Sequence, residues 1–452
     1  MTIAHRDVTN DLMPVSRVSK QRHPHLGRRV ATALLLGLCA CAPATDSIDA
    51  RSQAPSSSPP AAASPSHQHA KPMKGAQARQ VRLLMEQLLG HHAVLMVRLM
   101  RGPVDGERPF VDAADDSLGR NTDELVAAVG SVYGKPAGSS FRELWTEHVD
   151  ALKSYGEALA TNNQAARTDA TKALDDYAAK YGRAVNSLTG GRLPAGAVAA
   201  GVAEHIHHLI AAADAYAAED YQEAFAMQRT AYSGMFSTGK ALAGAIAEQP
   251  SGELPAAFDN PPAQLRSGLG LLLGEHSELA FDATRAVVAG YPSAEAAAGA
   301  LNENTKDINT AMRSALGTET ARVFSNIWGA HIDALVDFSV AVADGDVTAQ
   351  SAARARLDRF PARLGKVLPA LSGNTVTART VMEAIHAHDQ HLLQQVTSYA
   401  AKDYATSHEI AYAGYEHMHA IAATMADVLE GRVAGGAPRG GAATGDGGMA
   451  GP

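Results

Sequence analysis

Two copies of one segment decide the fold: FRELWTEHVDAL at residues 141–152 and FSNIWGAHIDAL at residues 324–335. Each copy holds one of the chain's two tryptophans, Trp145 and Trp328, which stand 183 residues apart. Similarity at a fixed period is the sequence signature of an internal duplication. The chain is therefore predicted to contain two homologous halves, so that each residue of interest in one half can be compared with its twin in the other.

Composition indicates a helical protein. Alanine is abundant among the 452 residues, aromatic residues account for only 5%, and glycine and proline gather between the periodic segments. Small side chains of this kind favour helices that pack closely. No strand-like alternation persists for more than a few residues. The formal net charge of −8 comes with no basic stripe, which argues against a nucleic-acid partner.

The periodicity predicts an all-α protein made of two tandem homologous helical bundles, with about six helices each and a four-helix-bundle-like core. The predicted boundaries are 76–248 for repeat 1, 249–262 for the inter-repeat linker and 263–430 for repeat 2. In the first half, helices are expected at residues 75–101, 121–133, 139–159, 162–188, 194–217 and 220–248. In the second half they are expected at residues 263–289, 304–316, 319–343, 348–371, 377–400 and 403–429.

Polar residues mark several of the expected helix starts. Asp220 and Asp403 occupy twin positions before the last helix of each half, where a carboxylate can accept the free amides of the first turn. Asn121-Thr122 and Asn304-Thr305 also recur, and they are predicted to cap the second helix of each half.

The amino terminus is typical of an export signal. Arg28 and Arg29 precede an apolar run at residues 30–40, which is too short to span a bilayer as a mature helix. The sequence from Leu38 to Cys41 resembles the lipobox of bacterial lipoproteins. This resemblance implies a signal peptide at residues 1–40 and a lipid on the sulfur of Cys41, with ordinary signal cleavage nearby as the alternative.

The signal predicts where the mature chain resides. We expect an exported lipoprotein of the cell envelope, periplasmic or on the outer surface, which meets the membrane through its lipid anchor only. Residues 41–75 are predicted to form a disordered Ser/Pro/Ala linker, and residues 431–452 a disordered Gly-rich tail. Because Cys39 would leave with the signal and Cys41 would carry lipid, the folded part has no thiol, and any metal must bind nitrogen, oxygen or thioether.

Histidine interrupts three core-facing stripes in each half. On the helix expected at 139–159, Phe141, Trp145, His148 and Leu152 recur at spacings of four and three, which places them on one face. The same construction occurs on the first and fifth expected helices of each half. The resulting twin pairs are His92 with His276, His148 with His331, and His205 with His388.

These histidines are predicted to meet in the centre of each half. Leaving a buried polar group without a partner costs about 1–3 kcal/mol, and mid-length positions on neighbouring helices of a bundle face one another. Imidazole binds zinc, copper, nickel and iron, and copper or zinc is favoured here ahead of iron. The predicted metal ligands are His92, His148, His205, His208, His276, His331, His388 and His391, with Tyr232, Met235, Tyr415 and Met418 as neighbours.

A structural interpretation of the same histidines stays open. A core histidine can simply bond a backbone carbonyl or a tyrosine, and a duplication copies structural residues as faithfully as functional ones. Ring nitrogens within about 4 Å of one another would favour a metal site, whereas rings more than about 8 Å apart would favour the structural interpretation. Asp150 and Asp333 lie two residues from key histidines and are predicted to be surface charges or interhelical partners.

The repeated Asn-Thr and Trp-x-x-His segments, at residues 121–122 and 145–148 and at their twins, resemble an uncharacterised helical domain of exported bacterial proteins. That domain is sometimes found in proteins labelled by a copper-amine-oxidase-like amino-terminal segment. The resemblance covers nearly all of residues 76–430 and implies an exported helical module. It implies no activity, because no amine oxidase catalytic domain or cofactor-forming motif is visible.

The leading functional hypothesis is transition-metal binding or buffering at the cell envelope, with one histidine site per half. A first alternative is a structural lipoprotein that docks an envelope protein partner and binds no metal. A second is a metal-dependent redox protein or enzyme with an open coordination position. The sequence contains no recognisable catalytic motif, so an enzyme is the less favoured class and no catalytic residue is proposed.

Overall fold

In the computed structural model, residues 75–248, 253–371 and 377–434 are described, and all regular secondary structure within them is α-helical. This confirms the all-α prediction for that part of the chain. The signal peptide, Cys41 and the 41–74 part of the linker lie outside the described residues. None of the described helices is long and apolar enough to cross a membrane.

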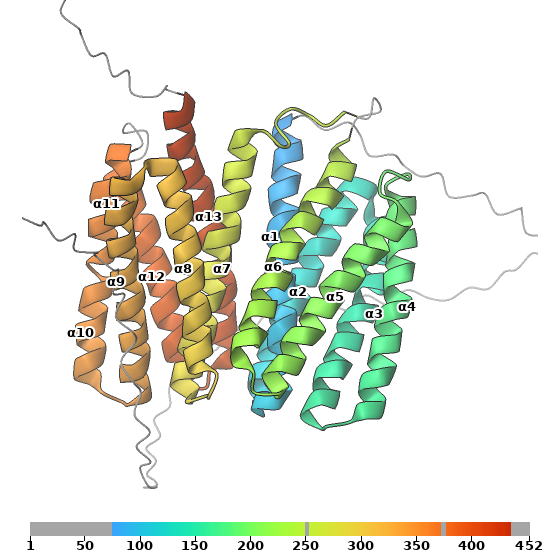
Figure 1. Cartoon of the computed structure of the whole chain (residues 1–452), viewed down its shortest axis with the longest axis horizontal. Coiled ribbons are helices and arrows are strands. Elements are labelled where there is room, and N and C mark those ends of the chain that lie inside the picture. The colour runs from blue at the N-terminus through green and yellow to red at the C-terminus, as the bar shows by residue number, and fades with distance from the viewer. Residues whose placement is uncertain (1–74, 249–252, 372–376, 435–452) are drawn as a thin grey trace, which may run out of the picture. The chain divides into compact units, whose positions relative to one another are not determined.

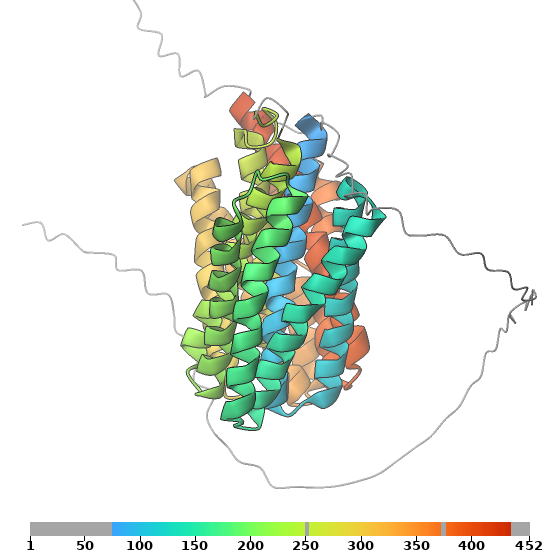
Figure 2. The same cartoon turned by 90° about the vertical axis from the view of Figure 1, so that its right-hand side faces the viewer.

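The helices lie side by side and run roughly parallel or antiparallel to one another (Figure 1, Figure 2). The first half contains α1 Gly75–Asp105, α2 Arg108–Tyr133, α3 Lys135–Ala160, α4 Gln164–Leu188, α5 Ala195–Ala217 and α6 Tyr221–Ala247. The second half contains α7 Pro261–Ala289, α8 Ala294–Leu316, α9 Thr318–Ala343, α10 Val347–Leu357, α11 Phe360–Leu371, α12 Ala378–Ala400 and α13 Tyr404–Ala434.

Two predicted helix starts are confirmed by their hydrogen bonds. The Asp220 carboxylate accepts the amide of Glu223 at 3.3 Å, and the Asp403 carboxylate accepts the amide of Thr406 at 3.2 Å. These twin caps satisfy amides that the first turn of a helix leaves without an internal partner. They place the start of α6 and of α13 at equivalent points of the two halves.

The predicted caps at Asn121 and Asn304 are wrong, because α2 and α8 begin earlier, at Arg108 and Ala294. Pro109 in the first turn of α2 favours that earlier start. Both asparagines instead lie inside their helices, fully buried. Asn121 donates to the carbonyl of Leu88 on α1 at 3.0 Å, and Asn304 donates to that of Leu272 on α7 at 3.0 Å. The repeated asparagine therefore ties two helices together instead of starting one.

The single helix predicted over residues 348–371 is also wrong. The structure has α10 ending at Leu357 and α11 beginning at Phe360. Pro361 explains the break, since proline has no amide to donate and its ring clashes with the carbonyl four residues earlier. Its twin in the first half is Ala178, and there α4 runs without interruption from Gln164 to Leu188.

The two halves pack against each other within one unit that includes all described residues. Helix α1 contacts α7, α6 contacts α7 and α8, and α13 contacts α2. Much of this contact is apolar, but its centre is a network of buried charges. The periodicity of the sequence did not predict that network.

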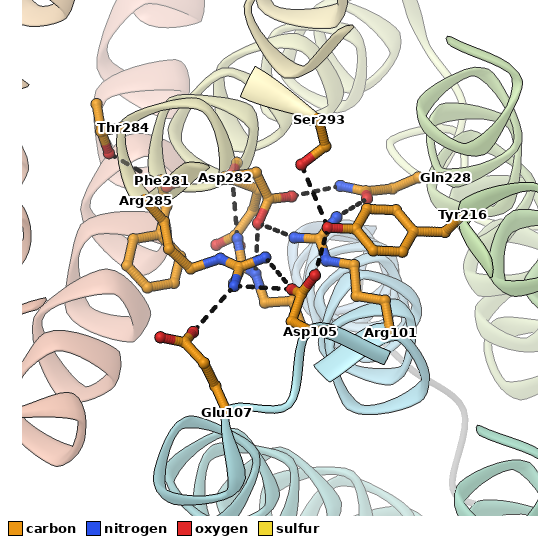
Figure 3. Close-up of polar contacts among 12 residues, drawn as sticks. Arg101, Asp105, Glu107, Tyr216, Gln228, Phe281, Asp282, Thr284, Arg285 and Ser293 are labelled. Atoms are coloured by element: carbon orange, nitrogen blue, oxygen red, sulfur yellow. Dashed lines mark hydrogen bonds and ion pairs between the residues drawn. The ribbon is translucent and has the colours of Figure 1, made fainter. Parts of the chain in front are cut away.

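Asp282 of α7 lies at the middle of the network (Figure 3). Arg98 of α1 donates from Nε to Asp282 Oδ1 at 3.0 Å and pairs with Glu278 at 2.6 Å. Arg101 of α1 binds the same Asp282 oxygen, and Gln228 of α6 donates to the other oxygen at 2.8 Å. Burial alone would raise the pKa of Asp282, but Arg101 and Arg98 outweigh it and hold that pKa well below its usual range.

A second part of the network joins the same helices one turn further on (Figure 3). Arg285 of α7 pairs with Asp105 at the end of α1 at 3.1 Å and with Glu107 at 3.4 Å. Tyr216 of α5 donates to Asp105 at 2.7 Å. Every buried cation here has a carboxylate partner from the other half, so the charges specify how the halves dock.

We predict that Asp282→Asn lowers the free energy of unfolding by about 3–5 kcal/mol, because it leaves Arg98 and Arg101 buried without their shared carboxylate. Glu303→Gln, which removes an exposed carboxylate beside Lys306 on α8, should leave stability nearly unchanged. Chemical denaturation of both variants measures the difference. Equal stability of the Asp282 variant and the wild type would contradict the assigned role.

Candidate metal centre

Three histidines from separate helices converge in the core of the second half. His276 lies on α7, His331 on α9 and His388 on α12, and each side chain is at most 1% exposed. Their ring centroids are 5.5–6.0 Å apart. One potential ligand atom from each ring lies within 4.8 Å of the other two. The convergence predicted from the stripes is therefore present, and the group can hold a metal ion.

The spacing of these atoms is slightly wider than a coordinated ion requires. Metal–nitrogen bonds of about 2.0–2.1 Å in a tetrahedral site hold ligand nitrogens roughly 3.4 Å apart. Shifts of less than about 1 Å in each ring would bring the three atoms to that separation. The observed separation is closer to the expectation for a metal site than to that for scattered structural histidines.

Aromatic side chains fix two of the rings. Trp328 contacts His276 at a centroid distance of 4.8 Å. Phe360, the first residue of α11, stacks on His331 at 4.2 Å with an interplanar angle of 18°. The rings are thus oriented by packing, as a preformed ligand set requires.

The first half builds a related arrangement in which two of the three rings lie closer together. His92 of α1 and His148 of α3 share a hydrogen bond between their Nε2 atoms at 3.2 Å. The His205 ring of α5 lies 5.8 Å from that of His92. Tyr177 stacks on His148 at 4.7 Å, just as its twin Phe360 stacks on His331. Within the described residues, only the second half brings three potential ligand atoms within 4.8 Å of one another.

Most of these ring nitrogens have no protein partner. Both nitrogens of His276 and of His205 are buried without a hydrogen bond, and so are Nδ1 of His92 and Nε2 of His388, among the residues that the structure describes. The structural interpretation expected carbonyl or tyrosine partners at these atoms. Each unsatisfied nitrogen costs about 1–3 kcal/mol, so the arrangement calls for a ligand that binds nitrogen lone pairs.

Burial keeps five of the six central imidazoles neutral. It lowers the pKa of His276, His388 and His92 well below the usual value, with a smaller contribution from neighbouring histidines. It lowers the pKa of His148 and of His205 to about 3. A metal binds the neutral ring, so no proton has to be displaced from these side chains near neutral pH.

Asp389 is a site residue that sequence reasoning missed. Its side chain is 2% exposed, and its Oδ1 lies 3.2 Å from Nδ1 of His331, an ion-pair distance without the alignment of a hydrogen bond. Carboxylates in this position hold a ligating histidine in one tautomer and leave its other nitrogen free. The signal was available, because the twin of Asp389 is Ile206 and a buried charge in only one half points to a specialised function.

The other predicted site residues lie outside the trio. His208 and His391 are only partly buried, and His391 contacts His417 of α13 edge-on at 5.4 Å. Met235 and Met418 pack in the hydrophobic cores of the first and second half. Asp150 and Asp333 are exposed, as predicted.

The two predicted tyrosine neighbours meet each other instead. The hydroxyl groups of Tyr232 and Tyr415 lie 3.4 Å apart between α6 and α13, and Tyr415 donates to the carbonyl of Gln87 at 2.9 Å. Neither hydroxyl hydrogen-bonds a histidine of the trio among the described residues. Tyr232 and Tyr415 therefore join the halves and do not complete the histidine sites.

Comparison with protein-family models, with curated proteins and with solved structures finds no match to this chain. Three buried imidazoles, packed against aromatic rings and beside one buried carboxylate, form a nitrogen donor set of the kind that borderline transition metals prefer.

We predict that stability falls with acid, partly through the first-half histidines. An unfolded histidine has a pKa of about 6.5, and in the folded protein burial lowers the pKa of His148 and His205 to about 3. The unfolded chain therefore binds the extra protons, and the free energy of unfolding falls as pH drops from about 6.5 toward 3. Each histidine contributes up to about 1.4 kcal/mol per pH unit.

The test compares denaturation of the wild type and a His148→Gln/His205→Gln variant between about pH 6.5 and pH 4. All other groups titrate in both proteins, so the difference in slope isolates the two histidines. A shallower slope in the variant is expected. Identical slopes would show that the two rings are not held neutral by burial.

Proposed function

We propose that this protein binds one transition-metal ion in the core of its second half, through His276, His331 and His388. The observation that carries the proposal is the group of three buried imidazoles whose ligand atoms lie within 4.8 Å of one another and mostly lack protein partners. Zinc and copper suit this all-nitrogen set best, and both accept a trigonal set of histidines with a further position open. Binding or buffering of such an ion is the proposed activity.

The second half is the stronger site for two reasons. His331 has the buried carboxylate of Asp389 beside its Nδ1 atom, whereas the twin of Asp389 is Ile206. In the first half, His92 and His148 already satisfy one nitrogen each through their mutual hydrogen bond. An ion in the first half must first break that bond, so the first-half trio is the weaker site.

We further propose that the described unit is a tandem of two homologous bundles of six helical segments, α10 and α11 together counting as one. Twin contacts support this proposal: the caps at Asp220 and Asp403, the buried amides of Asn121 and Asn304, and the stacking partners of the central histidines. A duplicated ancestor with one histidine trio would explain why both halves keep the trio.

The proposed location is the cell envelope, with the chain exported and anchored by a lipid on Cys41. This part of the proposal stands on the lipobox-like sequence before Cys41 alone. An envelope location fits a metal-binding role, because a lipid-anchored chain would hold its ion at the membrane surface.

We predict that the purified protein, incubated with zinc and desalted, retains close to one equivalent of metal. His331→Gln/His388→Gln should abolish retention, because one imidazole cannot hold the ion alone. The twin variant His148→Gln/His205→Gln should still retain one equivalent of zinc. It controls for the loss of two core histidines. Elemental analysis measures both, with circular dichroism to verify folding. Retention that survives in the second-half variant would contradict the proposed ligands.

We also predict that Asp389→Asn weakens metal binding by about 10–100-fold, since it removes the charge that orients His331. Burial raises the pKa of Asp389 while His331 opposes that change, so the carboxylate is coupled to the ring. Asp333→Asn, an exposed carboxylate two residues from His331, is the matched control and should have little effect. Competition with a chromogenic chelator measures both affinities, and equal affinities would remove Asp389 from the site.

A further inference from the structure

A small recess opens beside His331, at the break between α10 and α11. Its volume is about 110 Å³. One wall is formed by Ile327 and His331 of α9, and another by Phe360. Three arginines complete the lining: Arg356, Arg359 and Arg363. The recess thus combines one proposed metal ligand with a strongly basic wall.

Two of these arginines have no acidic partner in the described part of the chain. Arg356 pairs with Asp337 at the surface. Arg359 and Arg363 are exposed and form no ion pair with any residue in the part of the chain that the structure describes. They stand four residues apart and both line the recess. Unpaired guanidinium groups that share a concave surface are suited to bind the oxygens of a carboxylate or phosphate.

The local fold adds to this positive potential. Helix α11 is 12 residues long and begins at Phe360, so the positive end of its dipole lies at the recess. The volume of the recess is several times the roughly 30 Å³ that a water molecule occupies in the liquid. The recess therefore has room for a small oxyanion and not for an extended chain.

The first half has no equivalent of this wall. The twins of Arg356, Arg359 and Arg363 are Ala173, Asp176 and Lys180, and α4 continues through the position where α10 ends. The basic recess therefore coincides with the helix break at Pro361. It belongs to the half with the better-formed histidine trio.

We propose that the recess binds a small oxyanion, a phosphate or carboxylate group held by Arg359 and Arg363 next to His331. The arginines suffice for binding to the metal-free protein. A metal ion at His331 would strengthen the binding of the oxyanion. This coupling between metal and anion rests on the proposed function. Three neutral imidazoles and Asp389 would leave a divalent ion with a net positive charge, and a nearby anion reduces that charge. By linkage, anion and metal would then increase each other's affinity by the same factor.

Inorganic phosphate is titrated into the metal-free protein by calorimetry, with acetate as the carboxylate probe. Saturable binding of at least one of them with one site per chain is expected, and the tighter one identifies the oxyanion class. Arg359→Gln/Arg363→Gln should weaken it about tenfold or more, because charge-assisted hydrogen bonds are lost. Arg313→Gln/Arg322→Gln, which removes two exposed arginines from α8 and α9, is matched in charge and should change the affinity by less than about twofold.

Absence of saturable binding of both anions, or equal weakening in the two arginine variants, would overturn the oxyanion site. A zinc-loaded sample then tests the coupling, and tighter anion binding than in the metal-free protein is expected. If the protein retains no zinc, the metal proposal fails while the result with metal-free protein still decides the oxyanion site. If zinc is retained and leaves the anion affinity unchanged, the coupling is overturned.

Discussion

Polar atoms that fold away from water need partners, and most ring nitrogens of the central histidines have none among the described residues. His276, His331 and His388 sit at mid-length of three helices, surrounded by apolar and aromatic side chains. Burial lowers the pKa of His276 and His388, so both rings are neutral and each has one nitrogen with a free lone pair. A shared metal ion would bind one lone pair from each of the three rings, which would offset part of the cost of burying them.

At the contact between the halves, in contrast to the histidine trio, the buried polar groups have partners. There, buried arginines and carboxylates from different halves neutralise one another around Asp282. This network restricts how α7 packs against α1. Any shift of α7 would separate Asp282 from Arg98 and Arg101 in a low-dielectric interior. The rigid docking of α7 also positions His276, which lies on the same helix less than two turns before Asp282. The charge network and the histidine trio are therefore parts of one arrangement.

Helical periodicity and self-comparison were enough to predict the helical fold and the three histidines that converge. Both kinds of information are local or internal to the chain. The network around Asp282 was missed because pairing across a helix contact depends on packing that no periodicity encodes. Asn121 and Asn304 were taken for caps because a buried asparagine and a capping asparagine look alike in sequence. The effect of Pro361 and the position of Asp389 were visible as departures from their twins Ala178 and Ile206.

The positions at which the two halves have different residues carry the most functional information. Where the halves agree, they share the histidine trio and its stacking partners. Where they differ, the second half has Asp389, the break at Pro361 and the arginines of the recess. These differences all lie close to the histidine trio proposed as the metal site.

X-ray absorption spectroscopy of the zinc-loaded protein tests the central claim most directly. The account predicts three imidazole nitrogens bound to the ion at about 2.0–2.1 Å, with the multiple-scattering pattern of histidine rings. A first shell made only of oxygen atoms, or one with a single imidazole, would contradict it.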